Sequence, residues 1–146
     1  MRKSFYKSLL YVIVLLSTYS CNKLSRVDID NMLAIVDTSP DSVLSILKNV
    51  SANNLDEEEY AKYALVYTWV LDKHGNDVSN DSLLRHAYIY YKEHANDKFH
   101  ARCMYYMGKY YTIVDSIEQA EQCYNLAVES ANRHKDSKTE SFKTGN

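Results

Sequence analysis

The sequence predicts an all-α protein, an antiparallel array of helix hairpins with about three helix pairs after an N-terminal signal segment. Composition is the first reason, because 146 residues hold only three Gly and one Pro, which leaves few turn positions. Apolar residues that recur every three or four positions are the second reason. The third is one spacing of large and small residues, clear over residues 101–132 and weaker over residues 57–91. A chain of this length is expected to form one domain.

The overall composition argues against some classes of function. Hydrophobic residues make up 46% of the chain and charged residues 25%, which is typical of a globular protein. The formal net charge is −2 and no stripe of Lys or Arg stands out, so a nucleic-acid-binding surface is not expected. The unusual feature is the content of 14 Tyr.

The first 21 residues have the layout of a bacterial export signal. Basic residues at positions 2, 3 and 7 precede an apolar run of about 12 residues, and small or polar residues then lead to Cys21. A membrane-spanning helix needs about 20 apolar residues, so a permanent transmembrane anchor is the weaker interpretation. We therefore exclude residues 1–21 from the folded domain.

Cys21, directly after Ser20, resembles the lipid-bearing cysteine of a bacterial lipoprotein signal. Two residues depart from that pattern, because Thr18 stands where Leu is usual and Tyr19 is bulky. An ordinary cleaved signal and an uncleaved anchor stay open as alternatives. Lipidation of Cys21 would hold the protein at a membrane in the cell envelope, outside the cytoplasm. The residues after Cys21 contain no acidic export tag, which favours a periplasm-facing position over a surface-exposed one.

Two short helices are expected next. The first starts at Asp28 as N-cap and places an apolar face along residues 29–36. The second starts after Ser39 as N-cap, with Pro40 at its first position. Its apolar stripe consists of Val43, Leu44, Ile46, Leu47 and Val50. The two helices should form one short hairpin, without the small residues that allow close packing.

A longer helix pair is expected to follow. Its first helix starts near Asp56, with glutamates at positions 57–59 in its first turn, where the helix dipole favours them. The helix continues past Leu71 to a turn-rich loop, and Asp81 caps its partner helix. This second pair ends at Asn96-Asp97.

The pattern over residues 101–132 resembles the tetratricopeptide repeat, a helix–turn–helix unit of about 34 residues. Counted from Ala101, large residues stand at positions four, seven, eleven and twenty-four, and small ones at eight, twenty and twenty-seven. These repeat-core residues are Met104, Met107, Gly108, Tyr111, Ala120, Tyr124 and Ala127. Two antiparallel helices approach closely only where small residues such as Gly108 and Ala120 meet, while large neighbours fill the space beside them. Met104 in place of Trp, and Asn132 in place of Pro, are departures from the family.

A weaker copy of this pattern precedes it. Tyr60, Tyr63, Ala64 and Tyr67 repeat the spacing of the first helix, counted from Glu57. Ala87 and Tyr91 fit the positions of the second helix only after an insertion of about 11 residues relative to a standard unit. Asp115 and Glu118 are spaced as a capping box that would start the last helix of the clear repeat. We divide the mature chain into a repeat domain (22–132) and a polar tail or truncated next repeat (133–146).

The whole arrangement resembles the N-terminal region of tetratricopeptide-repeat lipoproteins of the Bacteroidetes type. Their order of parts is an export signal with Cys, a helix like Asp41–Leu47, and then repeats. The resemblance implies a non-catalytic protein–protein interaction module with an unknown protein or peptide partner. Some relatives continue to a membrane helix and a DNA-binding output domain, so a truncated sensor or regulator is one alternative. A self-associating structural envelope lipoprotein is another.

No catalytic or cofactor motif is found. The chain lacks a phosphate loop, a serine elbow and a dinucleotide fingerprint, and none of the five His stands in a helical zinc motif. We therefore expect no enzyme, no cofactor, no metal and no small-molecule substrate. Cys103 and Cys123 are expected to be small buried residues, with a disulfide as the alternative.

One helix stripe is a candidate surface for a partner. In the tetratricopeptide family the first helix of each repeat lines a groove through positions two, five, nine and twelve, which are Arg102, Tyr105, Lys109 and Thr112. Arg and Tyr often dominate protein interfaces, and two cations favour an acidic partner. The alternative is a solvated helix face. The stripe lacks the Asn and Lys arrangement with which some relatives hold a terminal carboxylate.

Overall fold

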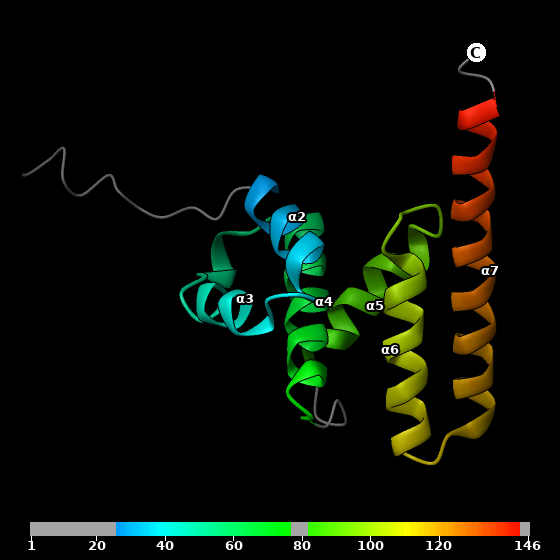
Figure 1. Cartoon of the computed structure of the whole chain (residues 1–146). Helices are drawn as coiled ribbons and strands as arrows, with labels where there is room; N and C mark the ends of the chain where they lie inside the picture. The colour runs from blue at the N-terminus through cyan, green and yellow to red at the C-terminus, as the bar shows by residue number, and fades with distance from the viewer. Residues whose placement is uncertain (1–25, 77–81, 144–146) are drawn as a thin grey trace, which may run out of the picture.

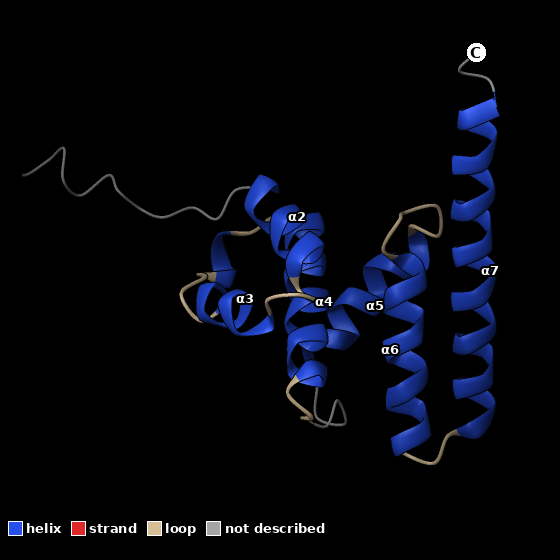
Figure 2. Ribbon diagram, viewed as in Figure 1, coloured by secondary structure: helices blue, strands red, loops and turns tan. Residues whose placement is uncertain are grey.

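The described part of the chain is entirely helical. The computed structural model describes residues 26–76 and 82–143, with side chains for residues 29–76 and 82–135. The elements are α2 (Arg26–Ile35), α3 (Pro40–Leu47), a short 3₁₀ turn η1 (Ala52–Asn54), α4 (Glu57–Lys73), α5 (Ser82–Glu93), α6 (His100–Ile113) and α7 (Ile117–Lys143). No strand occurs among these residues (Figure 2), which confirms the all-α prediction.

The first two helices differ in detail from the prediction. α2 begins at Arg26, so Asp28 lies inside the helix and the predicted N-cap is wrong. Arg has a higher helix propensity than Asp, so extending the helix to Arg26 costs little free energy. Ser39 does precede α3, with Pro40 in its first turn, but the Ser39 side chain makes no capping hydrogen bond. Ile46, expected in the apolar stripe of α3, is 44% exposed.

α4 starts at a capping box. The Asp56 carboxylate accepts a hydrogen bond from the Glu59 backbone N–H at 2.8 Å, and the Glu59 carboxylate accepts one from the Asp56 N–H at 3.1 Å. Both hydrogen bonds satisfy backbone donors that a helix start leaves unpaired. The predicted start of this helix near Asp56 is confirmed.

α4 is the centre of the described fold. Residues 61–66 and 68–70 are buried, which covers nearly the full circumference of the helix. α2, α3 and α5 all pack on it (Figure 1), and α6 makes a smaller contact with it. α2 and α3 each contact α4 more extensively than they contact each other. α2 and α3 therefore pack mainly against α4 and do not form a tight hairpin with each other.

A buried lysine connects α2 to α4. Lys62 is 4% exposed, and its ammonium lies 3.2 Å from an Asp30 oxygen in α2 and 2.9 Å from a Glu58 oxygen one turn earlier in α4. Burial lowers the pKa of Lys62, but the hydrogen bonds to Glu58 and Asp30 outweigh it, so the net pKa is raised. The ammonium therefore stays charged inside the protein.

The last two helices form an antiparallel pair. α6 and α7 lie side by side and run in opposite directions (Figure 1). α7 continues without a break past Asn132 to Lys143, and its C-terminal part extends beyond the other helices (Figure 1). The boundary that the sequence suggested at residue 132 thus lies within a helix.

The turn between α6 and α7 contradicts the predicted capping box. Asp115 has a φ of 57°, the left-handed conformation, and α7 begins two residues later at Ile117. The Ser116 N–H donates to the Tyr111 carbonyl at 2.8 Å, and the Asp115 N–H donates to the Thr112 carbonyl at 3.3 Å. This pair of bonds is a Schellman motif, so Asp115 ends α6 instead of capping α7.

The same motif ends α4, where the left-handed residue is Gly75 with a φ of 72°. The Asn76 N–H donates to the Leu71 carbonyl at 3.0 Å and the Gly75 N–H to the Asp72 carbonyl at 3.0 Å. Glycine adopts this conformation without a steric penalty, whereas Asp115 has a Cβ that opposes it.

We expect Asp115→Gly to raise the free energy of unfolding by about 0.5–1 kcal/mol, because glycine removes the left-handed penalty. Urea denaturation followed by circular dichroism measures the change. Asp115→Asn is the control, since Asn loses the charge and keeps a similar side chain, and its effect should stay within about 0.5 kcal/mol. An Asp115→Gly variant less stable than Asp115→Asn would contradict this account of the turn.

Candidate functional site

Arg102 lies at the contact between α6 and α4. Its guanidinium stacks on the Trp69 ring, with the guanidinium carbon 3.8 Å from the ring centroid. Within the described residues, the Arg102 N–H groups make no hydrogen bond. Stacking on the ring therefore holds the planar guanidinium in place, while its N–H groups stay available to donate hydrogen bonds to a partner.

Lys109, one of the stripe residues, is already paired within the chain. Its ammonium donates a hydrogen bond to the Asp72 carboxylate of α4, and the Tyr106 hydroxyl donates to the same carboxylate at 3.4 Å. The bond to Asp72 raises the pKa of Lys109, and burial opposes that change. The charge of Lys109 is thus largely neutralised, so Arg102 carries the positive charge of the stripe.

The two remaining stripe residues are exposed. Tyr105 is 41% exposed, and its ring centroid lies 6.1 Å from that of Tyr124 in α7. The Thr112 hydroxyl donates to the Gly108 carbonyl at 2.9 Å and lies 3.2 Å from the Tyr124 hydroxyl. The structure therefore turns Arg102 and Lys109 toward α4 and leaves Tyr105 as the exposed aromatic residue.

A cavity of about 330 Å³ lies between α6 and α7 beside the stripe. Arg102 and Tyr105 line it from α6, and Ala127, Val128 and Ala131 line it from α7. Val128 is 62% exposed, which is high for an aliphatic side chain. The small side chains of Ala127 and Ala131 leave space between the two helices. Arg102 and Tyr105 are the polar residues at the border of this otherwise apolar cavity.

The residues predicted as the repeat core lie on the two helices α6 and α7. Met104, Met107, Gly108, Ala120 and Ala127 are buried, and Tyr111 and Tyr124 are partly buried. The Tyr124 ring lies against Gly108, since a Cβ added there would be 2.6 Å from a Tyr124 ring carbon. The close approach of α6 and α7 thus depends on glycine at this position.

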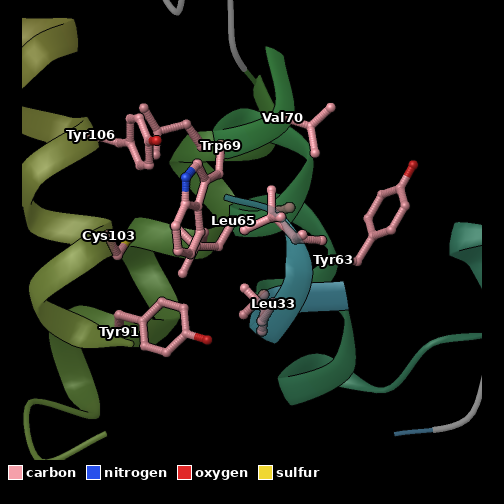
Figure 3. Close-up of a cluster of buried hydrophobic side chains, with 14 of the residues drawn as sticks. Leu33, Tyr63, Leu65, Trp69, Val70, Tyr91, Cys103 and Tyr106 are labelled. Carbon is pink, nitrogen blue, oxygen red and sulfur yellow. The ribbon is translucent and has the colours of Figure 1, made fainter. Parts of the chain in front are cut away.

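Two partner residues on α4 were not predicted from the sequence. Trp69, labelled in Figure 3, supplies the ring under Arg102, and Asp72 pairs with Lys109. A signal was present, because Trp69 and Asp72 are three residues apart on one face of α4 and their chemistry matches that of Arg102 and Lys109. Pairing them required the arrangement of α4 relative to α6, which no local pattern contains.

Other predicted features have a plain outcome. Cys103 and Cys123 are both buried and unbonded, and burial raises the pKa of each thiol. Among the described residues, no three His, Cys, Asp or Glu side chains group as a metal site. None of the described helices has the length and apolar character needed to span a membrane. Cys21, the signal segment and the predicted cap Asp81 lie outside the described residues.

We expect Gly108→Ala to lower the free energy of unfolding by about 1–2 kcal/mol, because displacing the Tyr124 ring costs more than the helix gains from alanine. Thermal and urea denaturation measure the effect. In a Tyr124→Ala background the clash is gone, so the same Gly108→Ala change should stabilise by up to about 1 kcal/mol. An effect of the same sign in both backgrounds would contradict the proposed contact.

Comparison with known proteins finds no match: no protein-family model, no curated protein and no solved structure is significantly similar to this chain.

Proposed function

We propose that this protein is a non-catalytic protein-interaction module that binds a partner segment over the cavity between α6 and α7. The observation that carries the proposal is the joint position of Arg102 and Tyr105 at the border of that cavity. An aromatic residue, an arginine and an exposed aliphatic residue, Val128, together are typical of protein interfaces.

The chemistry of the surface suggests what the partner segment contains. An apolar side chain would fill the cavity next to Val128, and an acidic side chain would accept hydrogen bonds from Arg102. Stacking on Trp69 already restricts Arg102, so binding would cost less side-chain entropy than it does for a mobile arginine. Lys109 contributes less to the acidic contact, because Asp72 already pairs with it.

The finer architecture belongs to the same proposal. We infer an array of the tetratricopeptide type, in which α4 and α5 form one unit and α6 and α7 the next. Support comes from corresponding small residues, since Ala87 in α5 and Ala120 in α7 are both buried at the position where the family has a small residue. The proposed location is the cell envelope, facing the periplasm, with a lipid on Cys21 as the anchor.

The interaction surface can be tested by photocrosslinking in cells that express the full chain. Benzoylphenylalanine at position 105 should give a discrete crosslinked product, because Tyr105 borders the cavity. The same crosslinker at position 117, where Ile117 is 60% exposed, is the matched control and should not give that product. Adding Val128→Glu should abolish the product, because its carboxylate would put a charge against the partner's apolar side chain and would compete with the partner's acidic side chain for Arg102.

Two results would contradict the proposed surface: no product from position 105, or a product that Val128→Glu leaves unchanged. A product that contains only a second copy of this chain would instead favour the self-associating envelope lipoprotein.

The anchor can be tested by intact mass measurement on the membrane fraction. We expect the mature protein to begin at Cys21 and to carry added acyl mass, because the thiol of that residue is the attachment point. Cys21→Ala should lose both the processing and the added mass. An unmodified wild-type chain in the soluble fraction would rule out the lipid anchor and would leave the crosslinking result unaffected.

A further inference from the structure

A second cavity lies where the start of α4 packs against α5. Its volume is about 310 Å³, and it shares no lining residue with the cavity between α6 and α7. Its walls come from the N-terminal end of α4 and from residues 86–90 of α5. Ligand pockets span about 300–1,000 Å³, so a volume at the lower end suits one extended side chain better than a large metabolite.

The walls of this cavity are aromatic and aliphatic. Tyr60, Tyr90 and Ile89 line it, and Ile89 is 54% exposed. His86 also lines it and meets the Tyr60 ring edge-on at a centroid distance of 5.3 Å. His94 stacks on Tyr90 at 4.0 Å. These ring contacts restrain both tyrosines, so the aromatic walls are formed before any ligand arrives.

The rim of this cavity is acidic. Asp56 and Glu57 line it, and no Lys or Arg is among its lining residues. One carboxylate oxygen of Asp56 accepts the Glu59 N–H, and its other oxygen has no hydrogen bond from the described residues. Lys62, further along α4, is already paired with two carboxylates. The rim thus carries negative charge that the neighbouring lysine does not cancel.

The negative charge near this cavity also affects the pKa of Tyr90. Burial raises the pKa of the Tyr90 phenol most, and the carboxylates of Glu58, Asp97 and Glu57 raise it further, against the opposite effect of Lys62. A negative potential that disfavours a phenolate favours a cation at the same place.

We infer that this cavity binds an arginine side chain of a partner protein. The guanidinium would pair with Glu57 and lie against the Tyr60 and Tyr90 rings, while the aliphatic stem would contact Ile89. The protein already contains one such arrangement, since the Arg102 guanidinium stacks on an aromatic ring of α4. Lysine fits less well, because it has no planar group to stack. This site goes beyond the proposed function and does not depend on it.

The test is a peptide titration of the isotope-labelled full chain, followed by amide chemical shifts, in detergent micelles where a lipid anchor requires them. The probe is a seven-residue peptide with one central arginine flanked by glycine and serine. Its matched control carries citrulline, which keeps the shape and removes the charge. A pH of 8 avoids the range in which imidazoles ordinarily become charged. We expect saturable shifts at residues 55–61 and 86–90 with the arginine peptide, and much weaker ones with citrulline.

Four variants locate the binding. Glu57→Gln should lower the affinity for the arginine peptide by about three- to fivefold, as expected for the loss of an exposed ion pair. Ile89→Lys should abolish binding, because it places an ammonium group in the cavity. Glu118→Gln, a glutamate in the first turn of α7, and Val128→Lys, at the other cavity, should leave the affinity unchanged.

The inference is overturned if citrulline binds as tightly as arginine, if the shifts map elsewhere, or if Glu57→Gln binds like Glu118→Gln. Glu57 is exposed, so its variant should keep the fold; thermal denaturation checks this. Should Ile89→Lys fail to fold, the Glu57 variant and the citrulline peptide still decide the question. None of these results bears on the crosslinking at position 105, so the two proposals fail separately.

Discussion

The fold depends on the need to cover α4 on nearly every side. A helix that is apolar around most of its circumference is unstable in water unless other elements bury it. α2, α3, α5 and α6 each cover part of it, which explains why α2 and α3 contact α4 more than each other. The buried ammonium of Lys62 is tolerated because two carboxylates flank it, and removing either would leave a charge poorly compensated. α4 therefore sets the position of its neighbours.

Local sequence rules predicted what local interactions determine. The start of α4 followed from Asp56 and the glutamates after it, and helical spacing located the described helices, although α7 continues to Lys143, well past its predicted end at residue 132. The rules failed where one residue could serve two helices, because Asp115 fits a cap for α7 yet ends α6. They also could not find contacts between helices far apart in the chain. The sequence alone indicated no partner for Arg102 or Lys109. In the fold, Arg102 stacks on Trp69 and Lys109 forms an ion pair with Asp72.

The two cavities differ in the charge that borders them, although the whole chain is close to neutral. Arg102 borders the cavity between α6 and α7, and carboxylates border the cavity between α4 and α5. Ion pairs within the chain account for much of the remaining charge near α4, including Lys62, Lys73 and Lys109 with their acidic partners. Net charge is therefore a poor guide to the partners of this protein, because the charges that matter are the few left outside such pairs.

The contact between Arg102 and Trp69 also gives the molecule a built-in optical probe. Trp69 is the single tryptophan of the chain, it is 6% exposed, and it lies on α4 against a cation from α6. Indole emission responds to nearby charge and to water, so its intensity and wavelength would change when these two helices separate. The 14 tyrosines absorb at shorter wavelengths and leave the red edge of excitation to Trp69. Motion between α4 and α6 can thus be followed without attaching a dye.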